Sequence, residues 1–244
     1  MRVRFYPGGG ARSNMAHRSK KGAAMADPIP ITVYSDVICP WCYVGKRRLE
    51  AALGGAGMPE HIRFSWRPFE LNPDMPAAGM ERRTYRARKF GEARSTELDR
   101  KMADTGNEVG IRFAFDRMQR TPNTRLAHRL IWEADRQNRQ DRLVERLFHG
   151  YFEDGLDIGT PEVLKRLAAE CGLDADKVQS ALTKSESLDA VTHLEEQGRR
   201  MGIQGVPFFI LLQRYQVSGA QPPEFWRETL PKIIAETGSA PTSS

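Results

Sequence analysis

Short apolar runs at the two ends of the chain flank a long region in which apolar residues recur at helical spacing. Residues 29–34 form a β-rich run, and residues 40–53 place Cys42 and Leu49 on one helical face. Residues 61–67 alternate apolar and polar side chains, as half-buried strands do. This order predicts a strand, a helix and a second strand, and the crossover makes the two strands parallel.

Helical periodicity dominates from residue 72 to residue 202, where glycine and proline separate the segments. An insertion of this length is a subdomain rather than a loop. The predicted helices cover residues 81–90, 95–108, 125–136, 143–151, 163–170 and 187–201.

A continuous apolar run begins at Pro207 and predicts a buried strand up to residue 212. A tight turn at residues 213–214 leads into a second short strand over residues 215–218. The apolar positions of residues 223–236 predict a final helix.

These elements predict an α/β fold in which a large all-helical insertion divides one sheet domain. We assign residues 28–71 and 203–237 to the sheet domain and residues 72–202 to the insertion. Residues 1–27 are expected to be a disordered basic tail, and residues 238–244 a disordered polar tail.

The net charge of +6 resides in the first 24 residues, which hold six basic side chains and no acidic one. The remainder is balanced, so its charge does not favour nucleic-acid binding. The sequence has no apolar run long enough to span a membrane and no secretory h-region. We therefore expect a cytoplasmic protein with no membrane and no nucleic-acid partner.

Cys39 and Cys42 lie three positions apart where the first strand passes into the first helix. Pro40 suits a first helical turn, and the unpaired amides there favour a negative charge. A thiolate is the reactive form of cysteine. This spacing predicts a redox-active pair in which Cys39 is exposed and attacks, while Cys42 points inward and resolves.

A zinc site and an inert core pair are the alternatives for these cysteines. Zinc usually takes four ligands, but Cys171 stands alone and the five histidines show no close pairing. Cys171 continues a helical apolar stripe, which predicts a buried thiol. We favour redox chemistry and expect no metal.

Several motifs together resemble the DsbA-like thioredoxin superfamily, and within it the FrnE-like branch. They are Cys39-Pro40-Trp41-Cys42, Gly205-Val206-Pro207-Phe208-Phe209, Val217-Ser218-Gly219-Ala220-Gln221, Asn123-Thr124 with Ala127-His128-Arg129-Leu130, and Pro68-Phe69-Glu70-Leu71-Asn72-Pro73. The resemblance covers roughly residues 31–230. It implies a thioredoxin-like fold with a helical insertion, in which a cis Val206–Pro207 bond faces the two cysteines.

The resemblance also implies a substrate-binding surface made of Pro40, Trp41, Val206 and Pro207. Backbone groups at Val206 would pair with an extended peptide. Trp41 offers apolar surface beside Cys39, although it could instead pack on the insertion. Arg47 and Arg48 are expected on a solvated helix face.

Two further residues are possible ligand contacts. His128 lies on a helix that the resemblance places near the cleft, and the alternative is a solvated or packed helical histidine. Asn123 could hydrogen-bond a ligand, and the alternative is a helix cap after Pro122.

Two functions remain open from the sequence. The first is a DsbA-like thiol–disulfide oxidoreductase that acts on protein or small-molecule thiols and disulfides. The second is a glutathione-dependent isomerase or transferase, related to kappa-class glutathione transferase and 2-hydroxychromene-2-carboxylate isomerase. Those relatives usually carry serine at the position of Cys39, so two thiols favour the first. Glutathione suits both, no cofactor beyond the redox-active disulfide is expected, and the chain is a monomer or homodimer.

Overall fold

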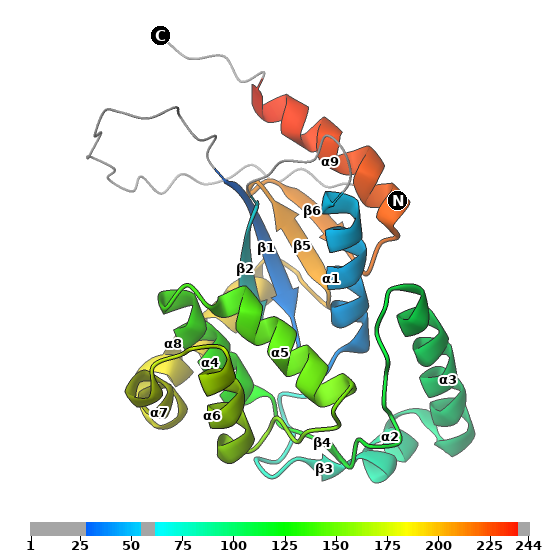
Figure 1. Cartoon of the computed structure of the whole chain (residues 1–244), viewed down its shortest axis with the longest axis vertical. Coiled ribbons are helices and arrows are strands. Elements are labelled where there is room, and N and C mark those ends of the chain that lie inside the picture. Colours follow the sequence, from blue (N-terminus) through cyan, green and yellow to red (C-terminus); the bar gives the residue numbers. More distant parts are fainter. Residues whose placement is uncertain (1–27, 55–61, 239–244) are drawn as a thin grey trace.

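The protein is described by a computed structural model that covers residues 28–54 and 62–238 (Figure 1). A four-stranded sheet lies at its centre in the order β2-β1-β5-β6. β2 runs parallel to β1, while β5 pairs antiparallel with β1 and β6 pairs antiparallel with β5. The strands are β1 (Ile29–Ser35), β2 (Ile62–Pro68), β5 (Phe208–Leu211) and β6 (Tyr215–Ser218).

The helices divide into two groups around this sheet (Figure 1). The helices that flank the insertion in sequence, α1 (Pro40–Leu53) and α9 (Pro223–Gly238), pack against each other. Three helices of the insertion contact β2, namely α4 (Arg125–Arg136), α5 (Gln140–Phe152) and α8 (Ser185–Arg200). The remaining described helices are α2 (Arg82–Phe90), α3 (Glu92–Glu108), α6 (Pro161–Glu170) and α7 (Ala175–Thr183).

The predicted α/β fold with a helical insertion is confirmed, including the parallel pairing of the first two strands. The insertion is not all-helical, because β3 (Met80–Glu81) and β4 (Arg120–Thr121) pair antiparallel. Two-residue strands are too short to show the alternation that identifies a strand. The predictions for residues 1–27, 61 and 239–244 lie outside the described residues.

Two local predictions were incomplete. The sequence analysis missed α7, although its N-cap Asp174 accepts a hydrogen bond from the Lys177 amide and is a typical helix start. The β5–β6 hairpin turns over three residues rather than two, because the strand ends at Leu211. Leu212 and Gln213 both have positive φ, which ends the extended conformation.

α1 carries a charged cluster against α5, and Arg47, which was predicted on a solvated helix face, is half-buried in it. Lys46 is only 4 % exposed, and its ammonium lies 3.0 Å from the Glu145 carboxylate. Arg47 also pairs with Glu145. Burial alone would lower the pKa of Lys46, but Asp141, Glu145 and Glu50 outweigh it and raise that pKa. Glu50 lies one turn away on α1, but Asp141 and Glu145 come from α5, and their position cannot be predicted from the local sequence.

Gly198 lets α8 lie close to β1. A Cβ atom at this position would be 2.7 Å from Cε1 of the buried Tyr34 ring. The ring cannot move aside easily because Tyr34 is part of the sheet. The missing side chain therefore sets how closely the last insertion helix approaches the sheet.

We expect Gly198→Ala to destabilise the protein. Overpacking costs about 1–3 kcal/mol, whereas the gain in helix propensity is at most about 1 kcal/mol, so the net loss should be about 1 kcal/mol. Urea denaturation gives the free energy of unfolding. Gly54→Ala is the control, since its Cβ would meet only the Glu50 carbonyl at 3.7 Å. An unchanged stability of Gly198→Ala would contradict the close approach.

Candidate active site

Asp36 shapes the turn that joins β1 to α1. Its carboxylate is fully buried and accepts hydrogen bonds from the amides of Ile38 at 3.4 Å and Leu71 at 2.8 Å. Its carbonyl oxygen accepts the Cys39 amide at 2.9 Å. A buried carboxylate needs such partners, and here they also fix where the first cysteine lies.

Cys39 is the N-cap of α1, and Pro40 is the first helical residue. The Cys39 thiol donates a weak hydrogen bond to the Val206 carbonyl oxygen at 3.7 Å. Cys39 is only 5 % exposed, so the prediction of an exposed attacking sulfur was wrong for this structure. Trp41 is 44 % exposed and offers the apolar surface that was predicted beside the cysteines.

Cys42 points inward, as the sequence predicts, and is 1 % exposed. Burial raises the pKa of the Cys42 thiol well above its ordinary value, and the adjacent Cys39 thiol raises it further. Hydrogen bonding to the Ser35 side chain and to the Asp36 backbone acts in the opposite direction. Both cysteines are free thiols here. The pair therefore contains a buried sulfur that ionises only with difficulty.

The proline loop faces the start of α1. The Val206–Pro207 peptide bond is cis. A Cβ atom on Gly45 would lie 3.0 Å from Pro207 Cγ, so this glycine lets the helix approach the proline. The Pro207 carbonyl oxygen accepts the Gly219 amide at 2.8 Å, and Arg48 donates to the Ala220 carbonyl oxygen at 2.8 Å. The structure thus brings Cys39 and the Val206–Pro207 bond together, and Arg48, which was predicted on a solvated helix face, is half-buried and binds the segment after β6.

His128 and Asn123 have different surroundings. His128 is buried, and its Nε2 atom lies 3.5 Å from Asp36 Oδ1. Asn123 donates from Nδ2 to the Met75 carbonyl oxygen at 2.7 Å and accepts the Arg125 amide at 2.9 Å. The histidine is thus joined to the cysteine turn through Asp36, whereas the Asn123 side chain holds the start of α4.

Three carboxylates surround His128. Burial alone would lower the pKa of His128, but Asp36, followed by Glu70 and Glu195, outweighs it and raises that pKa. Glu195 also accepts the Glu70 amide at 2.7 Å. Sequence reasoning missed all three acids as site residues. Asp36 could have been identified as a site residue, because it lies at the end of an apolar strand, three positions before Cys39. No sequence pattern marks Glu195 as a site residue.

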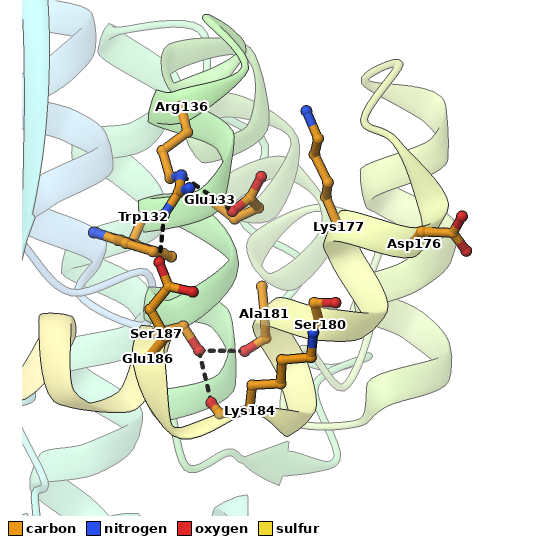
Figure 2. A pocket seen from close by; sticks show the side chains of 10 residues that line it. All are labelled: Trp132, Glu133, Arg136, Asp176, Lys177, Ser180, Ala181, Lys184, Glu186 and Ser187. Atoms are coloured by element: carbon orange, nitrogen blue, oxygen red, sulfur yellow. Dashed lines mark hydrogen bonds and ion pairs between the residues drawn. The ribbon is translucent and has the colours of Figure 1, made fainter.

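Other candidate positions lie apart from this site. Cys171 is buried at the end of α6, as predicted, and donates to the Arg142 carbonyl oxygen at 3.7 Å. A hollow of about 390 Å³ lies among α4, α7 and α8 and is lined by none of the predicted site residues (Figure 2). Inside it Arg136 pairs with Glu186, and Ser187 donates to the Ala181 carbonyl oxygen. Within the described ranges, no three His, Cys, Asp or Glu side chains are grouped to hold a metal ion.

Comparison with known proteins shows which family the chain belongs to. Residues 30–231 match the family model of the DSBA-like thioredoxin domain, and the chain belongs to this family. It is 30 % identical over 187 residues to the uncharacterized protein YwbO of Bacillus subtilis, which covers 75 % of this chain and 86 % of that protein.

Solved structures share the fold. A probable DsbA oxidoreductase from Streptomyces coelicolor aligns with a TM-score of 0.80 and 29 % identity over 88 % of this chain and 93 % of that one. The cytosolic disulfide reductase DsbM from Pseudomonas aeruginosa, solved with GSH, aligns with a TM-score of 0.60 and 19 % identity, covering 84 % and 99 %. A 2-hydroxychromene-2-carboxylate isomerase aligns with a TM-score of 0.63 and 12 % identity, covering 88 % of this chain and 100 % of that one. The fold is thus common to disulfide oxidoreductases and to this isomerase. Among the described helices, none has the length and apolar character needed to cross a bilayer.

The ion pair of His128 makes a pH-dependent contribution to stability. The pKa of His128 is raised in the folded state above its unfolded value near 6.5. The resulting stabilisation is therefore fully present below pH 6.5 and is lost as pH rises through the folded-state pKa. We expect His128→Gln to lose most stability relative to wild type at about pH 5.5 and least at about pH 8.5. Urea denaturation at both pH values measures this. His193→Gln, which removes an exposed histidine of α8, is the control, and a pH-independent loss in His128→Gln would contradict the ion pair.

Proposed function

We propose that this chain is a thiol–disulfide oxidoreductase in which Cys39 is the nucleophile and Cys42 the resolving thiol. The observation that carries the proposal is the position of the Cys39 thiol, at the N-cap of α1 and 3.7 Å from the Val206 carbonyl oxygen. The inward position of the second thiol supports the division of roles.

The proposed reaction has two exchange steps. The Cys39 thiolate attacks one sulfur of a substrate disulfide, a mixed disulfide forms, and the other sulfur leaves as a thiolate that takes a proton from solvent. Cys42 then attacks the Cys39 sulfur, which forms the Cys39–Cys42 disulfide and releases the second substrate thiol. The substrate gains two electrons and the cysteine pair loses two. The reverse sequence oxidises a dithiol substrate.

Substrate would bind across Trp41, Pro40, Val206 and Pro207. The exposed indole offers apolar contact beside Cys39, and an extended peptide can pair with the Val206 backbone. Glutathione is a plausible small thiol, since DsbM was solved with GSH on the same fold. We also propose the FrnE-like branch, from the motifs that resemble it, and a cytoplasmic setting, because the three cysteines do not make a structural disulfide framework.

A glutathione-dependent isomerase is the alternative, supported by the shared fold of the 2-hydroxychromene-2-carboxylate isomerase. Isomerisation needs no second thiol, whereas disulfide exchange within the protein does. The presence of Cys42 behind Cys39 therefore favours redox chemistry, and a variant at Cys42 separates the two functions.

We expect Cys39→Ser to abolish insulin reduction and the oxidation of glutathione by a disulfide substrate. We expect Cys42→Ser to stop at the mixed disulfide, because no second thiol is left to release the substrate. Mass spectrometry after mixing with oxidised glutathione detects one bound glutathione in Cys42→Ser and none in Cys39→Ser.

Cys171→Ser is the matched control and should retain full activity, since this thiol is buried and bonded to the Arg142 carbonyl oxygen. A Cys42→Ser variant with undiminished turnover would refute the resolving role of Cys42, and a wild-type protein without either redox activity would favour the isomerase.

A further inference from the structure

Two buried polar atoms beneath the cysteine pair have no hydrogen-bond partner among residues 28–54 and 62–238. They are Ser35 Oγ at the end of β1 and His128 Nε2 on α4. Ser35 and His128 line the same small void of about 10 Å³. Its other lining residues are Val37, Trp66, Arg67, Ile131 and Val144.

The size of this void matches one water molecule. A water needs roughly 10–15 Å³ and two or more polar partners, and the two orphaned atoms would provide them. A buried hydroxyl left without a partner costs about 1–3 kcal/mol, which favours hydration. The His128–Asp36 separation of 3.5 Å is longer than a normal N–H···O hydrogen bond, so Asp36 leaves His128 Nε2 able to bond a water in the void.

The same serine lies beside the buried thiol. The Ser35 side chain lowers the pKa of Cys42, against the larger effect of burial, so the serine is a neighbour of the thiol. Ser35 thus adjoins both the Cys42 thiol and the void that it shares with His128. His128 in turn faces the Asp36 carboxylate. A water in the void would complete a polar path from Cys42 to the Asp36–His128 pair.

The chemistry of Cys42 needs such a path. A thiol whose pKa lies well above 9 is less than about 1 % ionised at pH 7, and this one is 1 % exposed. In the mixed disulfide the negative charge of Cys39 is gone, but burial remains. The proton of Cys42 must therefore pass to a nearby base before the sulfur can attack.

We propose that Ser35 and a water held between it and His128 carry the proton of Cys42 to the His128 imidazole, which Asp36 holds and stabilises as the imidazolium. This inference rests on the proposed disulfide exchange. Cys42 gives its proton to Ser35 Oγ while the serine proton passes to the water and a water proton passes to His128. The Cys42 thiolate forms the bond to Cys39, and the substrate thiolate leaves with the electron pair of the broken bond.

The other charged groups around His128 act in both directions on the imidazolium. Glu70 and Glu195 add negative charge. Arg125 neutralises much of the Glu70 charge through a contact of 2.8 Å, and Arg67 borders the void. Proton return from His128 to Cys42 then serves the reverse reaction, in which the protein disulfide is reduced.

The first test measures the resolution step alone. Reduced protein is mixed with saturating oxidised glutathione, and acid-quenched samples give the rate of Cys39–Cys42 disulfide formation. We expect Ser35→Ala to slow this step at least about a hundredfold at pH 7, the low end for loss of proton-transfer assistance. Ser65→Ala, a serine of β2 outside the void lining, is the matched control.

The second test uses pH. The wild-type resolution rate should rise through an inflection above pH 6.5, as His128 loses its proton, and His128→Gln should lose that inflection. His193→Gln should keep it. A purely structural role would lower the rate at all pH values without moving the inflection, and that result would overturn the relay.

The relay and the redox function fail in different ways. Alkylation of Cys39 and formation of the glutathione mixed disulfide in Cys42→Ser do not require the relay, and they should be unchanged when Ser35→Ala is added. If the mixed disulfide never forms, the proposed function is wrong. If it forms and Ser35→Ala resolves it at the wild-type rate, the function stands and the relay is wrong.

Discussion

The buried Asp36 carboxylate is the constraint on which the candidate site depends. Its oxygen atoms hold the amides of Ile38 and Leu71, and its backbone carbonyl holds Cys39. Buried charge is unfavourable unless it is paired, and the available cation is His128 from the insertion. The turn that places the cysteines therefore provides partners for Asp36, and helix α4 of the insertion provides another.

This dependence gives the insertion a role in the site. α4 brings His128 to Asp36, and α8 brings Glu195 to the Glu70 amide. α5 closes the other side, where Tyr43 of α1 stacks on Phe148 with ring centroids 5.0 Å apart. The insertion thus supplies polar and aromatic surroundings for α1, and its helices are part of one core with the sheet.

Local patterns in the sequence predicted most of the fold, because period and capping are local properties. Residues 40–53 and 125–136 were predicted with the observed ends, and the cysteine pair was found from its place at a strand-to-helix junction. Burial of Lys46 and His128 was not predictable, since Asp141 and Glu145 beside Lys46, and Asp36 beside His128, lie on other elements. Exposure of Cys39 was misjudged because the Val206 loop, distant in sequence, covers it.

The burial of Cys39 limits what the proposed exchange can act on. Cys39 is nearly buried and its thiol contacts the Val206 carbonyl oxygen, while the adjacent Trp41 is exposed. Under the proposed mechanism, a flexible segment or a small disulfide would reach this sulfur more readily than a disulfide held inside a folded domain. Access to Cys39, as well as the reactivity of the pair, would then select the substrate.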